Sequence, residues 1–141
     1  MAWWKFWEQS AGRTPDYYEE GVVLVRQEMF HDALTSFRLA LKTRPDDPAT
    51  LEHMAVAYTH IGLPEEAVRS YQRALAIRPQ SPSAHYGLAF LLLKHGRRDE
   101  ASHHLEAFLS HARPGREEER HIVHARRTLE RLGGSSGDAP R

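Results

Sequence analysis

Apolar positions recur along this chain with a constant spacing. Ala33, Ala67 and Ala101 lie 34 positions apart, each directly after an acidic residue. Each alanine is followed by a bulky apolar residue four positions on and by an apolar pair seven and eight positions on. Upstream of each alanine, a second set of apolar residues recurs at intervals of three and four, the spacing of an amphipathic helix. The pattern therefore predicts an internal repeat in which each unit contributes two helices.

Glycine and proline mark the borders of these predicted helices. Gly62 and Gly96 fall between the two halves of a unit, where they break the helix. Pro64 suits the first turn of the helix that follows Gly62. Each unit also opens with a capping oxygen followed by proline, at the position where the missing N–H of proline needs no partner. These opening pairs are Thr14-Pro15, Asp47-Pro48 and Ser81-Pro82.

The three units carry a recognisable signature. The middle unit, 48–81, has its residues at Ala55, Tyr58, Gly62, Ala67, Tyr71, Ala74 and Pro79. The first unit, 14–47, matches at Tyr17, Gly21, Ala33, Phe37, Ala40 and Pro45, with Glu28 in place of the turn glycine. The third unit, 82–115, departs from the signature at His85 and Phe108. In this signature the chain resembles the tetratricopeptide repeat family.

The resemblance implies an all-α fold, a right-handed solenoid of three helix-turn-helix hairpins that together form a domain over 14–132. A final amphipathic pattern over 116–132 follows the third hairpin, and we expect it to cap the stack. Its predicted inward residues are Ile122, Ala125, Leu129 and Leu132. The glycine- and serine-rich stretch 133–141 is typical of a flexible tail.

Composition narrows the functional classes. The chain has 141 residues, and its 19 basic residues balance 19 acidic ones, so we expect no broad electrostatic contact with nucleic acid. It contains no cysteine, which excludes disulfides and thiol chemistry and fits a reducing, cytoplasmic environment. No cofactor-binding motif is present, so we expect no cofactor.

The first nine residues hold every tryptophan of the protein. On a helix, the four aromatic residues Trp3, Trp4, Phe6 and Trp7 share one face. We therefore expect residues 1–13 to form a short amphipathic helix followed by a joint to the first repeat. It is too short to span a bilayer and lacks the apolar core of a signal peptide. Three interpretations stay open. The aromatic face packs on the first repeat as a cap, inserts at a membrane interface, or is buried in a partner or in a sister subunit of a homo-oligomer.

The resemblance also implies a concave groove lined by the first helix of each hairpin. The implied inward positions are Tyr18, Val22, Val25 and Arg26, then Glu52, Val56, Thr59 and His60, then Tyr86, Phe90, Leu93 and Lys94. Their spacings of four, three and one keep each set on one helical stripe. Val25 and Leu93 are equally well explained as core residues between helices.

The chemistry of this predicted groove indicates the kind of partner. Val22, Val56 and Phe90 stand where members of the family that clamp a C-terminal carboxylate are expected to carry an asparagine, so we predict no such clamp. The groove has an apolar floor and, along one side, a basic ridge or rim of Arg26, His60 and Lys94. Such a surface suits an amphipathic helix or an extended peptide with apolar anchors and some acidic residues. The tryptophan-rich segment has complementary character, so Trp3, Trp4 and Trp7 of the same chain or of a neighbour are further candidate occupants that a partner must displace.

Neither metal binding nor catalysis is indicated. The chain has ten histidines, including the pair His121 and His124, but no cysteine and no His-Glu-x-x-His motif. We interpret the histidines as solvent-facing helix residues. No phosphate-binding glycine loop, nucleophile elbow or catalytic triad motif occurs, so we expect a non-catalytic protein.

Together, the sequence predicts a non-catalytic adaptor or structural subunit that binds another protein in the groove. The alternative is a membrane-peripheral assembly or accessory factor of a larger membrane complex. Its tryptophan-rich N-terminus would hold it at the surface of the cytoplasmic membrane.

Overall fold

The computed structural model describes residues 15–137, with side chains as far as residue 133. Within this range the chain forms helices and no strands, which confirms the all-α prediction. The helices are α2 (Tyr17–Arg26), α3 (Phe30–Thr43), α4 (Pro48–Ile61), α5 (Pro64–Ile77), α6 (Pro82–Lys94), α7 (Arg98–His111) and α8 (Arg116–Gly137). The predicted aromatic helix, with Trp3, Trp4, Phe6 and Trp7, lies outside the described residues.

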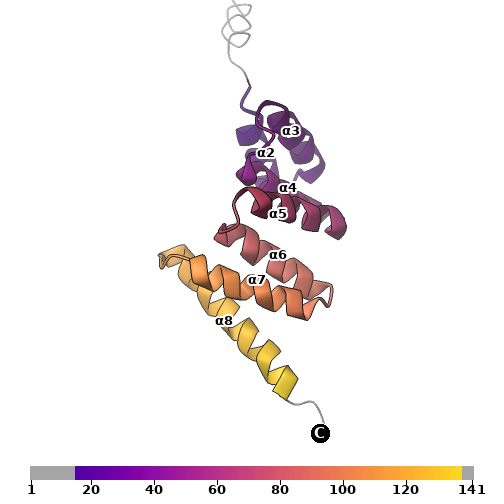
Figure 1. Ribbon diagram of the computed structural model, residues 1–141. Helices are drawn as coiled ribbons and strands as arrows, with labels where there is room; N and C mark the ends of the chain where they lie inside the picture. The colour runs from indigo at the N-terminus through magenta and orange to yellow at the C-terminus, as the bar shows by residue number, and fades with distance from the viewer. Residues whose placement is uncertain (1–14, 138–141) are drawn as a thin grey trace, which may run out of the picture.

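The helices pair into three hairpins, α2–α3, α4–α5 and α6–α7, and α8 follows the last (Figure 1). The hairpins stack in chain order, with α3 against α4, α5 against α6 and α7 against α8. The three periodic alanines, Ala33, Ala67 and Ala101, are each 0% exposed. They belong to a core that runs through the three hairpins without interruption between repeats.

A glycine permits the close approach of α2 and α3. A Cβ atom on Gly21 would lie 2.4 Å from the ring of Phe37, which is completely buried. Real Cβ atoms do not come so close to a packed ring, so Phe37 reaches the core only because position 21 has no side chain.

The turns inside the hairpins share one backbone conformation. Gly62 and Gly96 adopt left-handed φ angles of 88° and 77°, and Glu28 adopts φ 60° at the equivalent place in the first hairpin. In each hairpin the N–H of the following residue bonds back to the carbonyl five residues earlier, for example Met29 N to Leu24 O at 2.9 Å. The first hairpin therefore keeps the turn of the others although a side chain makes that turn unfavourable.

The predicted helix starts hold for two hairpins and fail for one. Pro48 and Pro82 are the first residues of α4 and α6. The predicted start at Thr14-Pro15 is wrong, because α2 begins at Tyr17 with Asp16 as its N-cap. The Asp16 carboxylate accepts the N–H of Glu19 at 3.1 Å, so the acid directly before α2 caps this helix instead.

The final helix packs as predicted but is longer. Ala125 is fully buried, and Ile122, Leu129 and Leu132 pack around the same core cluster. However, α8 continues to Gly137, beyond the predicted end at 132. Gly133 does not take up the left-handed φ that ends a helix at glycine, so the backbone stays helical through it.

In the third hairpin, His85 stands where the other hairpins have Tyr17 and Leu51, and its ring pairs with that of His104. His85 is 8% exposed, and its Nε2–H donates to the carbonyl of Pro79 at 2.8 Å. Its Nδ1 lies 3.0 Å from Nδ1 of His104, and in the neutral ring this Nδ1 accepts. Burial, and after it the neighbouring His85 and His103, lowers the pKa of His104, while Glu100 opposes this shift.

Replacing Glu28 by Gly is expected to stabilise the protein by about 1 kcal/mol, because glycine adopts φ near 60° without the Cβ clash. Urea unfolding measures the change. Gln27→Gly is the matched control, since Gln27 has φ −86° and gains nothing from glycine. Equal effects of the two substitutions would contradict the argument.

Acidification is expected to destabilise the fold through His104. The folded state favours the neutral ring, so the unfolded chain binds more protons below the ordinary pKa of 6.5. Stability is therefore complete above pH 6.5 and falls as the pH drops below that value. Urea unfolding between pH 7.5 and 5.5 should show a smaller decline for His104→Gln than for the parent, with the exposed His111→Gln as control. Parallel declines in all three proteins would rule out this role of His104.

Candidate peptide-binding groove

The predicted groove residues lie on α2, α4 and α6, the first helices of the three hairpins. Tyr18, Val22, Val25 and Leu93 are partly buried and pack against the core. Arg26, His60 and Lys94 are exposed. Val25 and Leu93 therefore pack as core residues between helices, which is one of the two interpretations that the sequence left open.

A hollow of about 260 Å³ lies between α4 and α6. Five of the predicted groove residues line it, namely Val56, Thr59, His60, Phe90 and Lys94. Tyr71, Gly87 and Leu91 complete its wall. The floor is apolar, and the polar atoms of His60 and Lys94 stand among the lining residues.

Gly87 and Tyr71 are two lining residues that the sequence did not reveal as part of the groove. A Cβ atom on Gly87 would lie 2.4 Å from the hydroxyl oxygen of Tyr71, so the missing side chain admits the phenol to the hollow. Burial, with a smaller contribution from Glu52, raises the pKa of Tyr71 to about 12, so its hydroxyl stays protonated. A signal was present, since the equivalent positions of the two preceding units hold His53 and Glu19, both with large side chains.

The groove is closed at its C-terminal end by α8. The ring of His124 stacks on Phe90 at 4.5 Å between centroids, and its Nδ1 lies 2.9 Å from the hydroxyl of Tyr86. His121 meets Tyr86 edge-on at 4.7 Å. Burial raises the pKa of Tyr86. His121 and His124 are both exposed, as expected of solvent-facing helix residues, and their rings also pack α8 against Tyr86 and Phe90.

Glu52 has a bracing role in the structure. Its carboxylate accepts from the hydroxyls of Ser81 at 2.5 Å and Ser83 at 2.7 Å, at the start of α6. These bonds tie the second hairpin to the third. Because both oxygens of this carboxylate accept hydrogen bonds at the start of α6, the side chains left to bind a partner at the groove rim are the basic ones.

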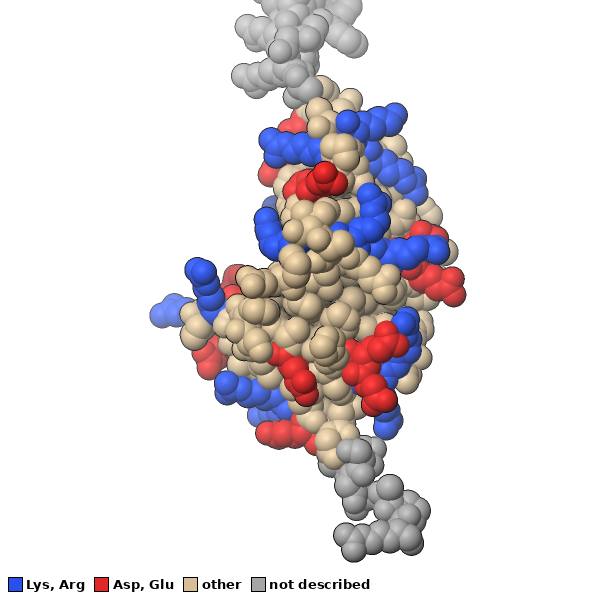
Figure 2. Space-filling view, viewed as in Figure 1, with Lys and Arg blue, Asp and Glu red and all other residues tan. Residues whose placement is uncertain are grey.

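The basic rim residues carry no ion pair within the part of the chain that the structure describes. Ion pairs at the start of α5 and α7 join Glu66 to Arg69 and Arg97 to Glu100. On the face drawn in Figure 2, charges of both signs lie above and below an uncharged zone. The ring of His60 stacks on Phe30 at 4.4 Å, which fixes its position on the rim.

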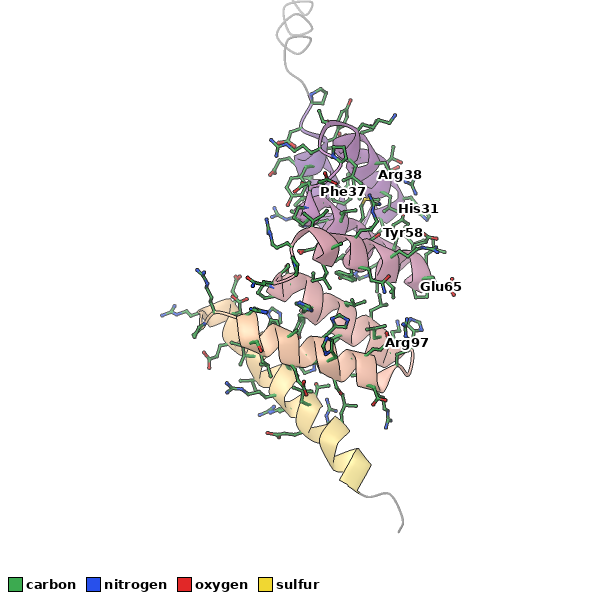
Figure 3. The ribbon with its side chains drawn as sticks, viewed as in Figure 1. His31, Phe37, Arg38, Tyr58, Glu65 and Arg97 are labelled. Atoms are coloured by element: carbon green, nitrogen blue, oxygen red, sulfur yellow. The ribbon has the colours of Figure 1, made fainter. Side chains whose placement is uncertain are left out.

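A larger hollow of about 520 Å³ lies between α5 and α6, lined by Val68, Leu91 and Leu92 with Glu65 and Arg97 among its polar residues. Figure 3 shows Glu65 and Arg97 at the same edge of the molecule.

Comparing equivalent positions in successive repeats explains the hollow between α5 and α6. The positions 64, 68, 72 and 92 hold Pro, Val, Gln and Leu, whereas the equivalent residues of the preceding unit are Phe30, Leu34, Arg38 and Tyr58. Arg38 donates to the Tyr58 hydroxyl at 3.2 Å, and the two lie side by side in Figure 3. The residues between α3 and α4 are thus larger than those between α5 and α6, and we attribute the hollow between α5 and α6 to this difference in size.

Two further features are absent from the described range. No group of three or more His, Asp or Glu side chains is placed to hold a metal ion there. None of the helices between residues 15 and 137 is long and apolar enough to cross a membrane.

Fold and groove define a class, the solenoids of stacked helical hairpins with a concave face. A family model described as TPR repeat matches residues 64–96. This segment covers α5 and α6, and the same periodic pattern continues on either side of it, as in the tetratricopeptide repeat family.

Two curated relatives match part of the chain. The peroxisomal targeting signal receptor of Eremothecium gossypii is 32% identical over 90 residues, which are 64% of this chain and 16% of that protein. The photosystem I assembly protein Ycf3 of a Synechococcus strain is 35% identical over 89 residues, 61% of this chain and 51% of that protein. The chain therefore spans a small part of the first relative and about half of the second.

A solved structure shares the fold over most of its length. The type III secretion chaperone SycD of Yersinia enterocolitica, in complex with a peptide of the translocator YopD, superposes with a TM-score of 0.79. The match covers 85% of this chain and 92% of that one at 17% identity.

Proposed function

We propose that this protein is a non-catalytic adaptor that binds an apolar segment of another protein in its concave groove. The observation that carries the proposal is the hollow of about 260 Å³ between α4 and α6, which gathers predicted groove residues from both helices. The peptide in the SycD structure and the signal receptor among the relatives support protein binding as the type of function.

The lining indicates what the bound segment contains. Val56, Phe90 and Leu91 offer an apolar wall for one anchoring side chain. Lys94 beside them, and Arg26 further along the rim, favour acidic residues next to that anchor. The Glu52 carboxylate accepts hydrogen bonds from Ser81 and Ser83, so we expect it not to cancel this preference for acidic residues.

A second candidate function is that of a peripheral factor in the assembly of a membrane complex. The photosystem I assembly protein among the relatives favours it. It needs Trp3, Trp4, Phe6 and Trp7 at a lipid surface, with the protein at the cytoplasmic membrane rather than free in the cytoplasm. These residues lie outside the described range, so the candidate rests on the sequence and on that relative.

An array of twelve-residue peptides that varies the anchor (Leu, Phe or Trp) and its flanking charge (Glu, Lys or Ser) tests the adaptor function. The full chain should prefer apolar anchors flanked by Glu. Val56→Arg should weaken this binding at least about tenfold, because a charge then stands in the apolar hollow. Lys94→Glu should shift the preference from Glu to Lys flanks.

The matched control is Lys42→Glu, which makes the same charge change at an exposed position of α3. It should leave the preference unchanged. Binding that ignores the anchor, or that Lys42→Glu alters as strongly as Lys94→Glu, would exclude the groove as the site.

A further inference from the structure

All three tryptophans lie before residue 8, outside the described residues that form the core. Its largest fully buried side chains include Phe37, Leu51, Leu88 and Leu105. Large aromatic side chains bury about 150–250 Å² each, so leaving several in water forfeits much stabilisation. The aromatic face of residues 3–7 therefore needs a surface to cover it.

The hollow between α4 and α6 has the size and lining for an aromatic ring. An apolar cavity of about 150 Å³ is enough to hold benzene, and this hollow measures about 260 Å³. Phe90 is among its lining residues, and the ring of Phe90 is fixed by its stack on His124. A tryptophan ring would thus meet apolar and aromatic neighbours held in place by α8.

The rim adds cations suited to tryptophan. Lys94 lines the hollow, and the exposed Arg26, two hairpins earlier, is predicted on the same ridge. Neither forms an ion pair within the described residues. A cation over an indole face is attracted by the ring, and tryptophan is the best partner for such a contact.

The segment is long enough to reach the hollow from its own chain. From the start of α2, the hollow lies about 15 Å along the helix axis, at about 1.5 Å per residue over the length of α2. It lies beyond α4, about one and a half helix spacings across, or about 15 Å. Residues 8–14 span up to about 23 Å when extended, which covers this diagonal.

We propose that, when no partner is bound, residues 3–7 of the same chain occupy the groove and place a tryptophan ring in the hollow between α4 and α6. A partner segment then binds by displacing them. The inference rests on the proposed function, because it names a resident competitor for the same groove. Tethering favours this occupant through its high effective concentration.

Tryptophan emission tests the inference, since every tryptophan reports from residues 3–7. In the full chain the emission should be blue-shifted and poorly quenched by acrylamide. Val56→Arg should shift it to the red and increase quenching. Val23→Arg is the matched control, because Val23 is 46% exposed on α2 and would be covered if the segment instead capped the first repeat.

Three results would overturn the inference. The first is a red shift with Val23→Arg and none with Val56→Arg. The second is an emission that turns red on about hundredfold dilution, which assigns the segment to a second copy. The third is a red, easily quenched emission that turns blue only when phosphatidylcholine–phosphatidylglycerol vesicles are added, which assigns it to lipid.

Cross-linking keeps the test decisive if Val56→Arg unfolds. The chain has no cysteine, so Phe6→Cys with Thr59→Cys forms a unique pair. A short bismaleimide should join them within one chain, and Phe6→Cys with Val23→Cys should react far less. The reverse order, or linked dimers, would contradict the inference.

Peptide binding separates this inference from the proposed function. Replacing Trp3, Trp4 and Trp7 together by Ser should tighten binding of the best array peptide, because the competitor is gone. Unchanged affinity would overturn the inference and leave groove binding intact. Loss of array binding in every variant would instead count against the groove itself.

Discussion

The structure depends on the close nesting of two helices at small residues. Ala33, Ala67 and Ala101 are completely buried on the second helices of the three hairpins, within the core that the hairpins share. Gly21 extends the same principle, because Phe37 occupies the space that a side chain there would take. Repeating this contact once in every unit stacks the hairpins and leaves the first helices side by side on one face.

The groove follows from that arrangement, and its chemical properties follow from side chains that differ at equivalent positions of the three repeats. Gly87 replaces a side chain found in the other units, so the Tyr71 phenol becomes part of the groove wall. Glu52 is occupied by Ser81 and Ser83, which leaves the rim basic. The chain thus combines a repeated scaffold geometry with a lining of its own.

Much of the fold could be predicted from the sequence because it rests on local periodicity. The hairpins, the glycine turns and the inward face of α8 all follow from the regular spacing of apolar and small residues. Helix ends were less predictable, since Asp16 competes with Thr14 as a cap and Gly133 keeps a helical backbone. Such choices depend on single hydrogen bonds and φ angles.

The site was only partly predictable for a different reason. The groove stripe lies on single helices, so its residues could be named from the sequence. The contacts of His124 with Phe90 and Tyr86, and of Gly87 with Tyr71, join different helices. The repeat period aligns positions in the chain, but it does not say which side chains meet across a hairpin interface.

The central claim is that the face formed by α2, α4 and α6 is the binding surface. The valines allow a direct measurement, because Val22 and Val56 are predicted groove residues, while Val23 is exposed on α2 and Val68 lines the hollow between α5 and α6. A methyl NMR spectrum of valine-labelled protein, recorded with the best array peptide, should show shifts of Val22 and Val56. Shifts of Val68 or Val23 with Val56 unmoved would contradict the account.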